Sequence, residues 1–174
     1  KALSLSMLGR FDEALSCVDE ALNLNPDYIA ALDFKQNLLK GEKKFKEAEK
    51  IIDKCIKLED TAHHNFHKAE ILYELGMASN NSQKIKEALK VQNKNIKKFK
   101  IKIEESKLEC SLRANIFYKL QKHNECLALL KILRKHDPEF NNPRSPIFFR
   151  MLTTLAALGN MKEMDRLLQG WHPT

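Results

Sequence analysis

The chain has 174 residues, of which 43% are hydrophobic and 30% charged, and its formal net charge is +7. This composition suits a globular protein with a real core and excludes a disordered chain, and no apolar stretch is long enough to span a bilayer. The chain has only five Gly and five Pro, the residues most typical of turns, and this low number favours a helical protein. The N-terminal stretch 1–10 fits one side of a helix rather than a signal peptide. Because the chain lacks an initiator Met, we expect it to be part of a longer protein.

A repeat of 34 residues organises the chain. The stretch "FDEALSCVDEALNLNP" at 11–26 returns as "FKEAEKIIDKCIKLED" at 45–60. The same element recurs three more times, with insertions of 6, 4 and 4 residues. The first insertion, "ASNNSQ" at 78–83, has the polar composition of a loop. Such a period indicates stacked supersecondary units, each of which buries its apolar face against its neighbours.

Each repeat reads as two helices. The segment 29–41 places its apolar residues on one side, and Gly41 is expected to stop that helix. The segment 45–59 has apolar residues at steps of three and four, which is typical of an amphipathic helix. Near 99–106 the pattern allows either a helix break or one continuous long helix.

The last unit has recognisable helix signals. Ser145 followed by Pro146 is typical of a helix N-terminus. Asn160 is expected to cap the last helix and Gly170 to end it. Trp171 is expected to cover the end of the core, with ligand stacking as the alternative.

Four cysteines are widely spaced and form no CxxC pair. All fall on apolar helical stripes, so we expect buried thiols in a reducing compartment and a cytoplasmic protein. The cysteines are Cys17, Cys55, Cys110 and Cys126.

The first repeat closely resembles the tetratricopeptide repeat. The resemblance rests on the aromatic Phe11, the small residues Ala14 and Ala21, and Asn25-Pro26 at the end of the unit. It weakens along the chain, where Cys55 and Cys126 replace small residues. It implies an all-α, right-handed superhelical stack of about five antiparallel helix hairpins in a single domain over 1–174. The expected repeats are 1–28 (partial), 29–62, 63–102, 103–140 and 144–170.

The resemblance also implies a concave groove that binds a peptide or helix of a partner protein. Phe34, Ile71 and Leu112 are expected as apolar anchors, with packing between repeats as the alternative for each. Asn37 and Asn115 are expected to hydrogen-bond a peptide backbone, because an amide both donates and accepts. The expected partner-binding residues are Phe34, Asn37, His64, His67, Lys68, Ile71, Leu112 and Asn115. The cationic set that clamps chaperone carboxylates is absent from these positions.

The histidines of "HHNFH" at 63–67 have a spacing that allows metal binding on a helix. A third ligand at fixed spacing is missing, so we favour exposed or groove-lining histidines and expect no metal or cofactor. No motif of nucleophilic, phosphate-binding or dinucleotide chemistry is present, so we expect a protein without catalytic activity.

The segment 84–107 holds nine Lys and three Glu. Its basic patch consists of Lys86, Lys90, Lys94 and Lys97 at helical spacing, opposite an apolar side. We favour a solvated face, with an acidic protein partner or nucleic acid as alternatives. Only Phe99 is aromatic there, so a base-stacking surface is lacking.

The function that the sequence predicts is a non-catalytic scaffold for protein–protein interaction, with association through 84–107 as the alternative. It predicts no membrane partner and leaves the oligomeric state open.

Overall fold

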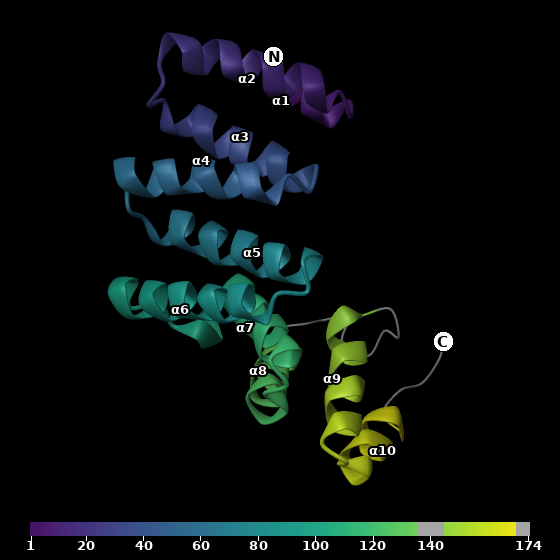
Figure 1. Cartoon of the computed structure of the whole chain (residues 1–174). Coiled ribbons are helices and arrows are strands. Elements are labelled where there is room, and N and C mark those ends of the chain that lie inside the picture. Colours follow the sequence, from purple (N-terminus) through teal and green to yellow (C-terminus); the bar gives the residue numbers. More distant parts are fainter. Residues whose placement is uncertain (136–144, 170–174) are drawn as a thin grey trace. The chain divides into compact units, whose positions relative to one another are not determined.

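The computed structural model describes residues 1–135 and 145–169 (Figure 1). These residues form ten α-helices and one 3-10 turn and contain no strand, which confirms the all-α prediction. In chain order the elements are α1 (Ala2–Met7), α2 (Phe11–Leu24), α3 (Ile29–Gly41), α4 (Phe45–Leu58), α5 (Ala62–Ala78), α6 (Ser82–Phe99), η1 (Ile103–Glu105), α7 (Lys107–Lys119), α8 (His123–Lys135), α9 (Pro146–Ala157) and α10 (Met161–Gln169). No helix of these ranges is long and apolar enough to cross a membrane.

The chain forms two compact units, residues 1–91 and 92–174, and the boundary between them falls inside α6. In the first unit each of the helices α1 to α4 packs against the next helix in the chain. In the second unit α7 packs against α8, α8 against α9, and α9 against α10. The predicted helix hairpins are therefore present in both units.

The two helices of each hairpin are joined by a three-residue turn with one conformation. The middle residue of every such turn has a left-handed φ, between 49° and 74°. The next backbone N–H donates to a carbonyl five residues earlier, as Lys44 does to Leu39 at 2.8 Å, which is the Schellman pattern. The left-handed residues are Gly9, Lys43, Asn80, Gln121 and Gly159. Gly41 is thus the last residue of α3, as expected, but Lys43 supplies the left-handed turn.

Small residues allow close helix contacts in the first unit. Ala14, Ala48, Ala69 and Ala88 are fully buried. Two clusters of buried side chains form the core from α2 to α5. Their buried members are Leu32, Leu39, Ala48, Ile52, Cys55 and Ile71 in one, and Ala14, Val18, Ala31 and Leu38 in the other.

Several local predictions are confirmed, and one open question is resolved. Ser145 accepts a hydrogen bond from the Phe148 N–H at the start of α9, and Asn160 Oδ1 accepts from the Glu163 N–H at 3.2 Å. The segment 99–106 is a helix break and not part of one long helix. The left-handed φ of 52° at Lys100 ends α6, and Ser106 caps the start of α7. Gly170 and Trp171 lie outside the described residues.

All four cysteines are free thiols. Cys55, Cys110 and Cys126 are buried, as expected, whereas Cys17 is half-buried. Burial raises the pKa of Cys110 to about 11 and also raises that of Cys126, so both thiols stay protonated at neutral pH.

Gln36 on α3 is a buried polar residue whose side-chain amide makes no hydrogen bond in the described chain. It is fully buried, and neither its Nε2 nor its Oε1 has a hydrogen-bond partner in the described chain. Burying an unpaired amide costs free energy, whereas a thioether of similar shape has no such cost. We therefore expect Gln36→Met to raise the free energy of unfolding by about 1–2 kcal/mol. Urea unfolding checks this against Gln83→Met, an exposed control expected to change stability by less than about 0.5 kcal/mol. A loss of stability in Gln36→Met would contradict the prediction.

Candidate functional site: a polar face on α3 and α5

The helices α3 and α5 begin two consecutive hairpins of the first unit, and an ion pair and an imidazole–carboxylate contact join them. Asp33 Oδ1 lies 3.2 Å from His64 Nε2, and Lys40 Nζ lies 2.6 Å from Glu70 Oε2. Residues spaced by three and four along these helices share a side with the paired residues. We call the resulting surface the α3–α5 face; it consists of Asp33, Asn37, Lys40, His63, His67, Glu70 and Glu74.

Five of the predicted partner-binding residues retain some exposure. Asn37 is exposed, while Phe34, His67, Lys68 and Asn115 are half-buried. Phe34 packs against the cluster formed by Ala14, Val18, Ala31 and Leu38, so its ring also contributes to the core. The ammonium group of Lys68 pairs with Asp53 on α4. Asn37 is therefore the predicted contact most accessible to a partner.

The other three predicted residues are buried. Ile71, Leu112 and His64 are 0%, 7% and 3% exposed. Ile71 and Leu112 thus pack between helices, which is the alternative role that the sequence left open for them. Leu112 and Asn115 lie on α7 in the second unit, whereas the other predicted residues belong to the first.

Charge on the α3–α5 face is set by a small network around Glu70. Burial alone would raise the pKa of Glu70, but hydrogen bonds from His67 and Lys40 outweigh it and hold the pKa below its usual 4.5. The Nδ1 of His67 lies 3.0 Å from Glu70 Oε2. Burial, together with the negative charge of Glu70, raises the pKa of Glu74. The α3–α5 face is therefore polar and charged.

The three neighbouring histidines have separate roles. His63 and His67 meet edge to face, with ring centroids 4.4 Å apart, and His67 also binds Glu70. His64 instead points inward to Asp33. Within the described ranges, His63, His64 and His67 do not form a group that converges on one ion.

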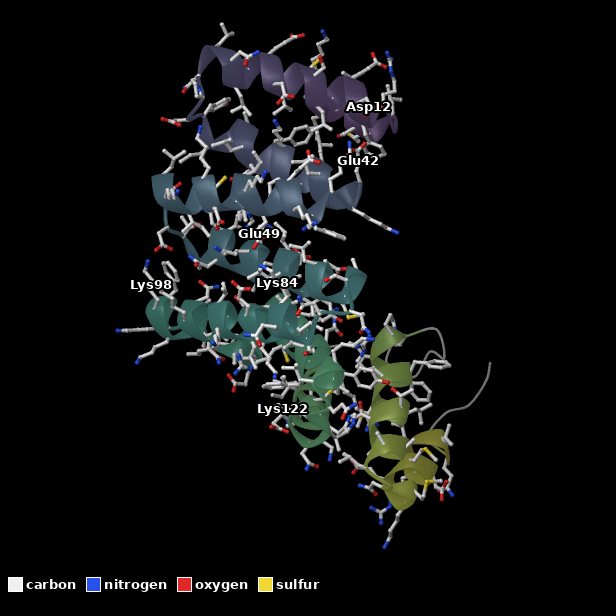
Figure 2. All side chains as sticks on the ribbon, viewed as in Figure 1. Asp12, Glu42, Glu49, Lys84, Lys98 and Lys122 are labelled. Carbon is white, nitrogen blue, oxygen red and sulfur yellow. The ribbon has the colours of Figure 1, made fainter. Side chains whose placement is uncertain are left out.

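The basic patch of α6 is open to solvent. Lys86, Lys90, Lys94 and Lys97 are exposed, and no ion pair in the described chain involves them. Lys84 differs, because its Nζ lies 3.2 Å from Glu49 Oε1 on α4 (Figure 2). The ammonium of Lys98 lies 4.9 Å from the centre of the Phe99 ring, which leaves that ring engaged within the chain.

A hollow of about 600 Å³ is lined by residues of α4, of the end of α5 and of the start of α6. Sequence reasoning did not indicate it, because its residues come from three helices. Its lining is Lys46, Glu49, Lys50, Asp53, Leu75, Ser79, Asn81 and Lys84.

Comparisons with known proteins agree with the fold. A tetratricopeptide repeat family model matches residues 1–28. A search of curated proteins finds no match. Among solved structures, PilW, described as a widely conserved type IV pilus biogenesis factor, has a TM-score of 0.74 at 15% identity, covering 98% of this chain and 72% of its own.

Two further structures are similarly close in fold. YrrB, described as a tetratricopeptide repeat protein with an unusual peptide-binding site, has a TM-score of 0.69 at 17% identity, covering 97% of this chain and 79% of its own. A thermophilic tetratricopeptide repeat protein of Thermus thermophilus, TTC0263, has a TM-score of 0.68 at 16% identity, covering 95% of this chain and 84% of its own. Residues 1–28 thus match the tetratricopeptide repeat family by sequence, and the described chain shares the fold of tetratricopeptide repeat proteins.

Proposed function

We propose that the protein is a non-catalytic scaffold that binds a peptide or helix of a partner protein on the α3–α5 face. The observation that carries the proposal is the exposed amide of Asn37 in a row of charged side chains. An exposed amide offers both a donor and an acceptor to a peptide backbone. The likeness to YrrB, which is described as having a peptide-binding site, supports the same class of ligand.

The chemistry of the face favours a polar occupant. Lys40 and Glu70 already form an ion pair, and Asp33 lies in contact with His64, so two of the three carboxyl groups of the face already have a side-chain partner. Such a surface suits backbone hydrogen bonds and paired charges better than deep apolar anchors. Phe34 is the predicted anchor that retains exposure, and it lies one residue from Asp33.

A second candidate function is association of an acidic partner or nucleic acid with the basic patch of α6. The exposure of Lys86, Lys90, Lys94 and Lys97 without ion pairs favours it. Binding of this kind weakens steeply with added salt, because counterions are released from the polyanion.

One experiment separates the two candidates. Peptides selected from a phage-displayed random library are titrated into the protein and into three variants. We expect Asn37→Ala to weaken binding about tenfold through lost backbone hydrogen bonds. The matched control Asn93→Ala, an exposed amide on α6, is expected to leave affinity unchanged. Equal binding by Asn37→Ala and wild type would refute the α3–α5 face. Salt-sensitive binding lost only in a Lys90→Gln, Lys94→Gln double variant would move the function to α6.

A further inference from the structure

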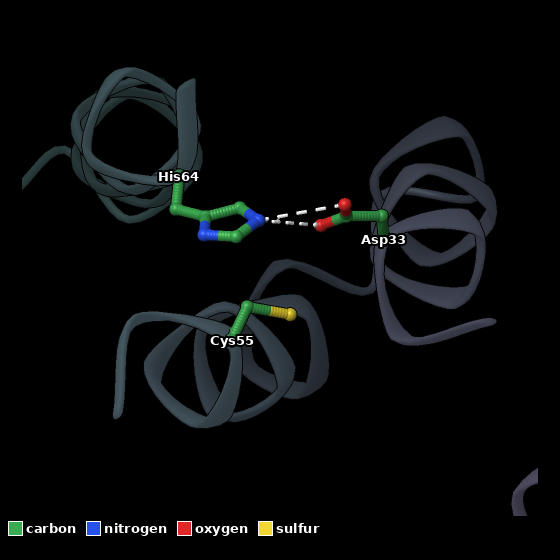
Figure 3. A group of neighbouring side chains, drawn as sticks. All are labelled: Asp33, Cys55 and His64. Atoms are coloured by element: carbon green, nitrogen blue, oxygen red, sulfur yellow. Dashed lines mark hydrogen bonds and ion pairs between the residues drawn. The ribbon is translucent and has the colours of Figure 1, made fainter. Parts of the chain in front are cut away.

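Three potential metal ligands from three successive helices meet inside the first unit. They are Asp33 on α3, Cys55 on α4 and His64 on α5 (Figure 3). One ligand atom of each residue lies within 4.8 Å of those of the other two. Cys55 is 0% exposed and His64 3%, whereas the side chain of Asp33 is 29% exposed. The cluster is therefore enclosed on two sides and reaches solvent beside Asp33.

The position of His64 is fixed by contacts with Thr61 and Glu59, which lie in the turn between α4 and α5. Thr61 caps α5 by accepting a hydrogen bond from the His64 N–H at 3.1 Å. The Nδ1 of His64 lies 2.6 Å from the Glu59 carbonyl oxygen, which only accepts, so Nδ1 carries a proton. The other ring nitrogen, Nε2, is thereby directed at Asp33.

The contact between His64 and Asp33 needs a positive charge. Nε2 lies 3.2 Å from Asp33 Oδ1 and 3.4 Å from Oδ2. If Nε2 carries no proton, its lone pair faces a carboxylate and both groups are acceptors. Either a second ring proton or a bound cation resolves this conflict. Donation of Nδ1–H to a carbonyl is also the common way in which a metal-bound histidine is oriented.

We propose that Asp33 Oδ, Cys55 Sγ and His64 Nε2 form a Zn²⁺ site that joins α3, α4 and α5. One nitrogen, one sulfur and one oxygen donor are a ligand set that zinc accepts, with a fourth position left to solvent on the Asp33 side. A tetrahedral zinc site places its ligand atoms roughly 3.3–3.6 Å apart, given the usual bond lengths. The separation between Nε2 and Asp33 already fits. The Sγ lies within 4.8 Å of both other ligand atoms, so it needs to approach by at most roughly 1.5 Å, a movement within the reach of a side-chain rotation.

Charge balance also favours a divalent ion. A thiolate, a carboxylate and a neutral imidazole carry two negative charges, which Zn²⁺ neutralises in a buried place. In the metal-free protein, burial, followed by the charge of Asp33 and a hydrogen bond to it, raises the pKa of Cys55 to about 12. The thiol is thus no nucleophile at neutral pH, and zinc must displace its proton.

The repeat itself supplies a variant that is expected to fold. Cys55 is 34 residues after Ala21, so alanine already occupies the corresponding position of the first repeat. Cys55→Ala therefore removes the sulfur while keeping a small residue at a helix crossing. Cys110→Ala is the matched control, because Cys110 is also buried but lies against the Leu129 carbonyl and outside any metal-ligand group of the described residues.

The test is a calorimetric titration of the chelator-treated 174-residue chain with Zn²⁺ alone. We expect binding of one ion per chain, a higher thermal unfolding midpoint with zinc, and release of protons into the buffer. Cys55→Ala and His64→Gln are expected to lower zinc affinity by about 100-fold or more, and Cys110→Ala to leave it unchanged. Titration with Co²⁺ is expected to produce a thiolate charge-transfer band that Cys17→Ala retains and Cys55→Ala loses.

The proposal fails if the wild-type chain binds no stoichiometric zinc. It also fails if binding persists in both Cys55→Ala and His64→Gln, which would place the ion on surface groups such as His63 and His67. If circular dichroism shows that Cys55→Ala does not fold, the proposal is tested instead by the cobalt spectrum of the wild type and by the zinc affinity of His64→Gln. An absent thiolate band in the wild type would then overturn the assignment.

Discussion

Gly76→Ala is expected to destabilise the first unit by about 1–3 kcal/mol, the range typical of overpacking. A Cβ at position 76 would lie 2.5 Å from Ile85 Cγ1 and 3.0 Å from both Asn81 O and Ile85 N. Two of these atoms belong to the backbone, and Ile85 is buried, so none of the three can move freely. Gly76 therefore sets how closely α6 approaches the end of α5.

Urea unfolding followed by circular dichroism measures this effect. The matched control is Gly41→Ala, because no atom lies within 4 Å of a Cβ at that position and its φ is not left-handed. Alanine has the higher helix propensity, so the control is expected to be neutral or up to about 1 kcal/mol more stable. If both variants unfold at the same urea concentration, the close approach at Gly76 does not limit the packing.

Glu109→Ala is expected to reduce the stability of the second unit by about 2–4 kcal/mol, since it leaves buried amide donors unpaired. Glu109 is 4% exposed at the start of α7. Its Oε2 accepts from Gln92 Nε2 at 2.8 Å, and its Oε1 accepts from Asn95 Nδ2 at 3.0 Å. Both amides belong to α6 and are also buried. The carboxylate therefore holds the end of α6 against the start of α7.

A pair of further variants tests the polarity of this contact. Glu109→Gln keeps the volume but turns one acceptor into a donor facing an amide donor, so we expect a smaller loss than in Glu109→Ala. Glu104→Ala, an exposed acidic residue nearby, is expected to change the free energy of unfolding by less than about 0.5 kcal/mol. Equal stability of Glu109→Ala and Glu104→Ala in urea would show that the buried hydrogen bonds contribute nothing net.

The regular part of the fold was predictable because one periodic signal repeats along the chain. In α4 the apolar residues follow steps of three and four. The bounds of α3 match the segment expected from the sequence, and α4 ends one residue before the end of its expected segment. The left-handed turn residues were less visible. Glycine marks two of the five turns, whereas Lys43, Asn80 and Gln121 adopt the same conformation through the packing of the helices that they join.

The candidate site was predictable only in part. An apolar residue is expected to be buried and a charged one exposed, but at the start of α7 the reverse holds. Leu108 is 68% exposed, while Glu109 is buried against two amides of α6. Similarly, nothing in the spacing of Asp33, Cys55 and His64 matches a metal motif, since the three meet only when successive helices stack. Residue type and periodicity predict which side of a helix is buried, but they do not predict which buried polar groups find each other.

The short left-handed turns also have a consequence for how the chain acquires its structure during synthesis. Each turn brings two helices together after only three intervening residues, so the loop-closure entropy of a hairpin is small. Contacts that are local in sequence form quickly, and N-terminal units fold before the chain is complete. We therefore expect the hairpins of residues 1–91 to pack on the ribosome while the later helices are still being translated.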